Sequence, residues 1–243
     1  MIDKPYSALA EIYEKVLSDE EYSCWAEYLC SLVKSHSNGL SGLDMACGTG
    51  YFTRALKRAG FYVEGIDLSS DMLNIALSLA RKEGLNVLFR EGDMSAVKNF
   101  TKVDFITVVN DGINYLSPEK IEKTFKRFYS LLKQDGVLFF DVSTEYKLKN
   151  VIANNVFSVD TEDFTYVWFN TQGRDKVDMD ISVFIKDGDR YLKKEERQTQ
   201  YVHKTEDLYK KLEKCGYKTV IVNEHLGGEL KPDSLRAQFI AKK

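Results

Sequence analysis

Cysteine and histidine are too few and too scattered in this chain to build a disulfide framework or a zinc site. The 243 residues include four cysteines and three histidines, with no C-x-x-C pair and no cysteine–histidine cluster of zinc spacing. We therefore expect no metal, and reduced thiols as in a cytoplasmic protein. No apolar run approaches the length that spans a bilayer, and residues 1–5 do not resemble a signal peptide, so we expect no membrane partner.

An excess of positive charge is also missing. The chain has 34 basic and 37 acidic residues and a formal net charge of −3, which gives no general attraction for nucleic acid, although a local basic patch stays open. Its hydrophobic fraction of 44% and charged fraction of 29% are those of a globular protein. At this length the chain can bury a sizeable core, as one large domain or as a core with a small addition.

A glycine-rich turn stands out against these absences. The residues before Gly48 and Gly50 favour a short buried strand, and those from Tyr51 onward favour a helix. Such a turn presents backbone N–H groups and the positive end of a helix dipole at the carboxyl edge of a sheet, where nucleotide-like ligands bind. The third glycine of the dinucleotide fingerprint is replaced by Thr53, and the Lys-Ser/Thr ending of a P-loop is absent. No pyrophosphate cradle is therefore specified.

Three acidic residues lie at the ends of apolar runs along the chain. Asp44 comes just before the glycines, Asp67 ends the run that begins at Val63, and Asp93 follows the run at 87–89. The carboxylate of Asp44 can hold a cationic amino group, and that of Asp67 can accept hydrogen bonds from both ribose hydroxyls. The carboxylate of Asp93 can reach an adenine amino group. The alternative for Asp67 and Asp93 is an ordinary cap before a helix.

In this order the segments resemble three motifs of the class I S-adenosylmethionine-dependent methyltransferases. Residues 44–50 are similar to the first motif, 65–69 to the second and 92–94 to the third, all within residues 1–150. A single glycine-rich motif is weak evidence, but three motifs in order, each after an apolar run, are specific. The resemblance implies S-adenosylmethionine as the cofactor and S-adenosylhomocysteine as the product.

The same resemblance implies a set of residues that bind the cofactor. The two glycines of the turn would pass close to the methionine part, and Asp67 would bind the ribose diol. Asp93 and the backbone of Met94 would bind adenine. The full implied set is Tyr6, Tyr13, Asp44, Ala46, Cys47, Gly48, Gly50, Asp67, Leu68, Met72, Asp93, Met94 and Asn110.

Two helices are expected before the glycine-rich turn. Apolar residues at helical spacing predict one from Pro5 to Leu17 and another over 22–33, ending near 38–39. In the resembled enzymes such leading helices lie over the cofactor pocket, and Tyr6 and Tyr13 share a face of the first. The alternative is that both aromatic rings pack into a helix–sheet interface.

Strands and helices alternate through the middle of the chain, which predicts a mostly parallel sheet. Strands are expected near 40–46, 61–66, 86–90, 103–109, 136–142, 218–222 and 235–241, and helices near 50–59, 70–83, 118–133 and 205–215. With the resemblance, the expected fold class is α/β: a Rossmann-like methyltransferase fold with a mostly parallel seven-stranded sheet, helices on both faces and an inserted antiparallel β meander.

The inserted segment is recognised by strict alternation of apolar and polar residues. Three antiparallel strands are expected at 163–171, 177–185 and 191–203, with a two-residue hairpin turn at Asp187-Gly188. An insertion at this edge of the sheet can cover the pocket and supply substrate contacts. Its exposed strands could also pair two subunits into a homo-oligomer.

We therefore divide the chain into a cofactor-binding core, residues 1–150 and 204–243, and an inserted subdomain that covers the substrate, residues 151–203. This layout resembles the small-molecule branch of the family, which includes sugar N,N-dimethyltransferases and glycine N-methyltransferase-like enzymes. The resemblance implies a small-molecule methyl acceptor.

Residues 108–116, after the fourth core strand, are where the resembled enzymes place groups that face the reacting methyl. There Asn110 would lie near the cofactor, and Asp111 could accept a proton from an ammonium or position it. His203, at the end of the meander, could be a general base or a partly exposed histidine at a strand end. Methyl transfer requires alignment and exclusion of water rather than a rigid catalytic triad.

Two motifs that mark particular acceptors are missing. The Asn/Asp-Pro-Pro-aromatic motif of enzymes that methylate nitrogens in nucleic acids and proteins is excluded, because Asp111 and Gly112 stand at the proline positions. No proline precedes a cysteine, as cytosine-C5 enzymes require. These absences favour a small molecule, with an amine nitrogen as the expected target. The alternatives left open are methylation of RNA or protein, and a non-catalytic cofactor-binding subunit.

Overall fold

The core of the molecule is a mostly parallel sheet of seven strands, as predicted. The structure is a computed structural model that describes residues 8–16, 19–98 and 100–243. The strand order is β10-β11-β5-β4-β1-β2-β3, in which β11 pairs antiparallel with both of its neighbours and the other pairs are parallel. The strands are β1 Ser41–Met45, β2 Tyr62–Asp67, β3 Leu88–Glu91, β4 Val103–Val108, β5 Leu132–Ser143, β10 Thr219–Glu224 and β11 Arg236–Lys242.

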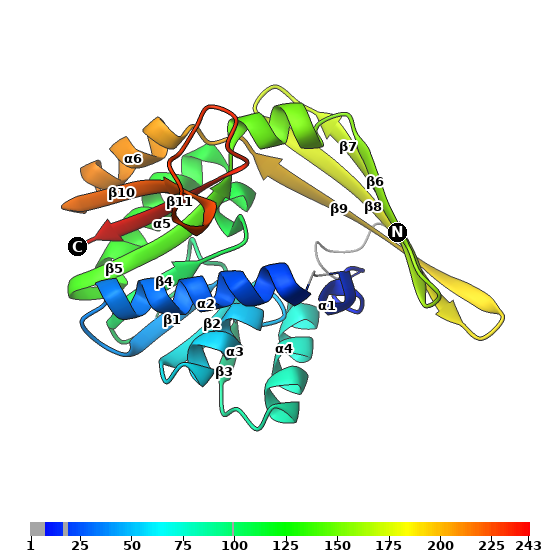
Figure 1. The fold of residues 1–243 in the computed structure, drawn as a ribbon, viewed down its shortest axis with the longest axis horizontal. Coiled ribbons are helices and arrows are strands. Elements are labelled where there is room, and N and C mark those ends of the chain that lie inside the picture. The colour runs from blue at the N-terminus through cyan, green and yellow to red at the C-terminus, as the bar shows by residue number, and fades with distance from the viewer. Residues whose placement is uncertain (1–7, 17–18, 99) are drawn as a thin grey trace.

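Helices cover both faces of this sheet (Figure 1). They are α2 Asp19–His36, α3 Tyr51–Arg58, α4 Ser70–Lys82, α5 Pro118–Leu131 and α6 Thr205–Lys214. Neighbouring residues of β5 point to opposite faces, so Phe139 packs with Trp25 of α2 and Leu56 of α3, whereas Phe140 packs with Phe125 of α5. None of the described helices is long and apolar enough to cross a membrane.

A second sheet of four antiparallel strands extends to one side of the core (Figure 1). Its strands pair in chain order: β6 Val156–Asp160, β7 Phe164–Gln172, β8 Lys176–Asp187 and β9 Arg190–Tyr201. The prediction of three strands is wrong because it misses β6. That strand lies at the edge of the sheet and has no buried residue, so it lacks the apolar alternation of a strand with one buried face.

The hairpin turn between β8 and β9 forms one residue later than predicted. Asp187 pairs with Arg190, which leaves Gly188 and Asp189 as the two loop residues. Gly188 has a φ of +60°, and this left-handed conformation is what a tight hairpin of this length requires. The second sheet takes all its strands from residues 156–201, while the division of the chain into two domains stays a prediction.

The first leading helix is much shorter than predicted. Among the described residues 8–16, only Tyr13–Val16 (α1) is α-helical, whereas α2 agrees with the second predicted helix. In β9, the carboxylate of Glu196 accepts the backbone N–H groups of Ala8 (2.8 Å) and Leu9 (3.2 Å). These contacts tie the start of the segment to the second sheet.

Candidate active site

The glycine-rich turn after β1 borders a cavity of about 600 Å³, counted with the solvent at its mouth. Ala46, Gly48 and Gly50 all have left-handed φ values there, of 56°, 54° and 74°. A Cβ added to Gly48 would meet no atom within 4 Å, so this backbone lies open to the cavity. A Cβ added to Gly50 would lie 2.8 Å from the ring of Phe89, so this glycine serves packing where α3 begins.

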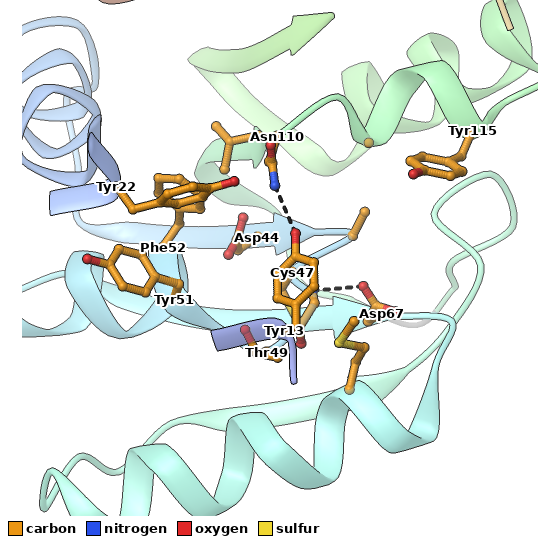
Figure 2. Close-up of a pocket in the computed structure, with 15 residues that line it drawn as sticks. Tyr13, Tyr22, Asp44, Cys47, Thr49, Tyr51, Phe52, Asp67, Asn110 and Tyr115 are labelled. Carbon is orange, nitrogen blue, oxygen red and sulfur yellow. Dashed lines mark hydrogen bonds between the residues drawn. The ribbon is translucent and has the colours of Figure 1, made fainter. Parts of the chain in front are cut away.

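Asp67, at the end of β2, lines the same cavity and is held by backbone donors (Figure 2). Its Oδ2 accepts the N–H of Gly48 at 2.8 Å, and its Oδ1 accepts the N–H of Ser69 at 2.9 Å. Burial raises the pKa of Asp67, against the lowering effect of these N–H groups. The cap of α4 is Ser69, whose Oγ accepts the N–H of Met72 at 3.3 Å, and Met72 also borders the cavity.

Asp44 lies at the floor of the cavity and is buried. Its carboxylate accepts hydrogen bonds from the hydroxyls of Thr53 (2.5 Å) and Thr107 (2.7 Å). Thr53 therefore replaces the third glycine of the dinucleotide fingerprint with a donor to this acid. Burial raises the pKa of Asp44 to about 6, and the two hydroxyl bonds offset only part of that effect.

Tyr13 brings the short helix α1 into the site. Figure 2 shows its ring between Asn110 and Asp67, and its hydroxyl accepts a hydrogen bond from Nδ2 of Asn110 at 2.9 Å. The next residue, Glu14, accepts the hydroxyl of Thr49 at 2.5 Å and pairs with Arg54 at 3.2 Å. The segment that carries Tyr13 is thus fastened to the glycine-rich turn itself.

A second and larger cavity adjoins the first. Its volume, also counted with the solvent at its mouth, is about 1340 Å³. The second sheet supplies an apolar wall that includes Tyr166, Trp168 and Met179. Asp111 and Arg236 lie among its polar lining residues. The residues that line both cavities are Tyr13, Tyr22, Asn110 and Tyr115.

A buried ion network supports the turn between these cavities. Asn110 and Asp111 have φ values of 61° and 53°, and Asp141 of β5 accepts their backbone N–H groups at 2.7 and 2.9 Å. Arg236 of β11 bridges the carboxylates of Asp111 and Asp141, and Gln200 donates to Asp111 at 2.7 Å. Burial favours the neutral form of Asp111 and would raise its pKa. The charge of Arg236 acts in the opposite direction and holds the pKa of Asp111 below its usual value.

His203 does not reach either of these cavities. Its ring is buried, with Nε2 3.0 Å from the carbonyl oxygen of Leu116, and burial lowers its pKa. It borders a separate cavity together with Thr144 and Lys204. The expectation of a partly exposed histidine is wrong, because the ring turns inward to a backbone partner. The structure does not bring His203 together with Asp111.

The remaining expected residues divide between the cavity and its surroundings. Asp93 accepts the N–H of Ser95 at 2.8 Å, and neither Asp93 nor Met94 is among the residues that line the two cavities. Leu68 is exposed. Ala46 and Cys47 line the first cavity. Tyr6 lies outside the described residues.

Comparison with known proteins gives matches over the whole chain. The sequence profile of a methyltransferase domain matches residues 43–136. "Putative methyltransferase YqeM" of Bacillus subtilis (strain 168) is 30% identical over 216 residues, which cover 87% of this chain and 86% of that protein. The crystal structure of a S-adenosylmethionine-dependent methyltransferase from Clostridium acetobutylicum ATCC 824 has a TM-score of 0.88 at 30% identity, over 98% of each chain.

Two further relatives match about half of the chain and name different acceptors. A dTDP-3-amino-3,6-dideoxy-alpha-D-glucopyranose N,N-dimethyltransferase of Streptomyces fradiae is 31% identical over 134 residues, 54% of this chain and 51% of that protein. A ubiquinone biosynthesis O-methyltransferase of Actinobacillus pleuropneumoniae serotype 5b (strain L20) is 36% identical over 117 residues, 44% of this chain and 49% of that protein. The whole-length matches show that the chain belongs to the class I S-adenosylmethionine-dependent methyltransferases, with S-adenosylmethionine as its cofactor.

Proposed function

We propose that the protein transfers the methyl group of S-adenosylmethionine to a small-molecule acceptor, at an amine nitrogen. The observation that carries this proposal is the junction of the two cavities, which meet at Tyr13, Asn110 and Tyr115. The second cavity gives an acceptor a place beside the cofactor with a wall of aromatic and aliphatic side chains. Such a space aligns the reactants and excludes water, which an in-line displacement requires.

The residues of the first cavity fit the cofactor. The open backbone at Gly48 leaves room for the methionine part, and the carboxylate of Asp67 has acceptor capacity for the ribose hydroxyls. Asp44, when ionised, would hold the ammonium group. S-adenosylmethionine supplies a methyl group already activated on a sulfonium, with a neutral leaving group. The assignment of adenine to Asp93 and Met94 stays a prediction, since neither lines the cavity.

An amine nitrogen is proposed because neither residue expected to act as a base is available for that role. Asp111 is bound by Arg236 and Gln200, and its pKa is lowered. His203 is buried against Leu116, away from the acceptor cavity. A hydroxyl nucleophile needs a base to take its proton in the transition state, whereas an amine provides its neutral form from solution.

A panel of matched acceptors tests this function. Each small amine is paired with the alcohol of the same carbon skeleton, and methyl-labelled S-adenosylmethionine is the donor. We expect label in the amines, with one S-adenosylhomocysteine formed per methyl group transferred. Label found only in the alcohols would contradict the choice of nitrogen. Label found only in added RNA or protein would contradict a small acceptor, and cofactor binding without any transfer would indicate a non-catalytic subunit.

A further inference from the structure

Asp111, which lines the polar end of the second cavity, and Asp141, which like Asp111 contacts Arg236, are already hydrogen-bonded within the protein. The two oxygens of Asp111 accept hydrogen bonds from Arg236 at 2.5 Å and from Gln200 at 2.7 Å. The two oxygens of Asp141 accept the N–H groups of residues 110 and 111, and Arg236 pairs with one of them. Both acids are therefore already paired with the guanidinium of Arg236 within the protein.

Lys147 is a cation at this end that forms no direct ion pair among the described residues, while the charges of Asp111, Asp141 and Glu21 act on it at longer range. It belongs to the π-helix η2 Lys147–Ile152, lines the cavity and is half-buried. Its Nζ makes no ion pair or hydrogen bond with any side chain that the structure describes. Lys149, in the same helix, pairs with Glu145 at 2.6 Å. A direct contact to the ammonium group of Lys147, which is partly removed from water, is therefore left for a ligand to supply.

The other charges around the cavity do not fill this role. Glu21 of α2 lines the cavity, but it is exposed and forms no ion pair with Lys147 among the described residues. Arg236 is committed to Asp111 and Asp141 and lies over the ring of Trp25. Lys147 is therefore the cation lining this cavity that has no direct ion pair among the described residues.

We propose that the methyl acceptor carries an anionic group, a carboxylate or a phosphate, which Lys147 binds while the rest of the acceptor lies against the apolar wall that includes Trp168 and Met179. This inference rests on the proposed function, because it assigns the acceptor class for the same site. It assigns to Lys147 a contact with substrate that the sequence motifs do not indicate.

The test uses full-length protein saturated with S-adenosylhomocysteine and four probes that share a phenyl ring: benzoate, phenyl phosphate, benzyl alcohol and benzylamine. Tryptophan fluorescence reports binding, because Trp168 lines the cavity. At constant ionic strength we expect benzoate or phenyl phosphate to bind about tenfold more tightly than benzyl alcohol, the gain of one charge-assisted contact. The tighter of the two anions identifies the group.

Matched variants separate this contact from general electrostatics. Lys147→Gln should reduce the affinity for the anionic probe to that for benzyl alcohol, with the affinity for S-adenosylhomocysteine unchanged within about twofold. Lys149→Gln, which removes an ion-paired lysine from the same helix, should keep the preference for anions, and so should Glu21→Gln. Equal affinity for benzyl alcohol or benzylamine, or an equal loss in Lys149→Gln, would overturn the inference.

The acceptor panel keeps this inference distinct from the proposed function. If uncharged amines are methylated and Lys147→Gln leaves their kcat/KM and that of anionic amines unchanged, the proposed function stands and the inference falls. If anionic amines are the better substrates and Lys147→Gln raises their KM selectively, both are supported.

Discussion

At the scale of single residues, the three carboxylates of the site differ in what sets their charge. Asp67 is held by two backbone N–H groups, Asp44 by two threonine hydroxyls, and Asp111 by the guanidinium of Arg236. Burial raises the pKa of all three, but at Asp111 the charges of Arg236 and Lys147 and its hydrogen bonds outweigh burial, so its pKa is lowered while those of Asp44 and Asp67 are raised. The three acids therefore respond differently to pH and to substitution.

Replacing Asp67 tests its assignment to the ribose. In Asp67→Asn one oxygen is kept and the charge is lost, so fewer strong acceptors remain for the hydroxyls. We expect the affinity for S-adenosylhomocysteine, measured by calorimetry, to fall by about 10- to 100-fold. Asp71→Asn, an exposed acid in the first turn of α4, is the control and should bind as the parent does. Unchanged affinity in Asp67→Asn would remove the assignment.

The raised pKa of Asp44 predicts a pH-dependent affinity for the cofactor. The carboxylate attracts an ammonium group only when ionised, and with a pKa of about 6 it is mostly neutral at lower pH. Between pH 7 and pH 5 the affinity for S-adenosylhomocysteine should therefore fall by about tenfold. Asp44→Asn should bind weakly and without this dependence. Affinity that rises as the pH falls would contradict the contact.

At the scale of elements, the turn between the two cavities depends on strands that are distant in sequence. Asp141 of β5 holds the left-handed backbone of Asn110 and Asp111, and Arg236 of β11 neutralises both acids. Left-handed φ values cost energy for residues other than glycine, so the surrounding contacts must over-determine them. We infer that β5 and β11 position this turn for the site.

Removing the guanidinium tests this support. Arg236→Leu leaves two buried carboxylates without their cation, and we expect the free energy of unfolding in urea to fall by about 3 to 5 kcal/mol. Arg197→Leu removes an exposed pair with Asp180 and should cost less than about 1 kcal/mol. Equal losses in the two variants would show that the buried network contributes no more than a surface pair.

The elements of the core and their contribution to the site could largely be predicted from the sequence. Strands buried on both faces give apolar runs, and the ends of those runs locate Asp44 and Asp67. Asp141 also ends such a run, but its role depends on Arg236, which lies 95 residues away with no motif around it. Lys147 and Gln200 were missed for the same reason, since tertiary contacts alone bring them to the cavity. The edge strand β6 was missed because it is short and none of its residues is fully buried.

At the scale of the whole molecule, residues 8–16 connect the core to the second sheet. Glu14 is fastened to Thr49 and Arg54 of the core, while Ala8 and Leu9 are held by Glu196 of β9. Tyr13, between these anchors, lines both cavities. The two cavities therefore share one short segment, which contacts both the core and the second sheet.

This arrangement predicts where hydrogen exchange changes when the cofactor product binds. S-adenosylhomocysteine should slow amide exchange in residues 8–16 and in the turn at 46–50, because contacts with Tyr13 and Gly48 suppress local opening. The hairpin at 187–190, far along the second sheet, should exchange at the same rate with and without it (Figure 1). Protection confined to the turn, with none at 8–16, would contradict a role for α1 in the site.

The most direct test of the central claim is a crystal structure of the complex with S-adenosylhomocysteine. The account predicts the adenosyl group beside Asp67 and Met72, with the sulfur directed at the junction of the cavities near Asn110 and Tyr115. A sulfur that faces away from the second cavity, or a product bound outside the glycine-rich turn, would contradict it.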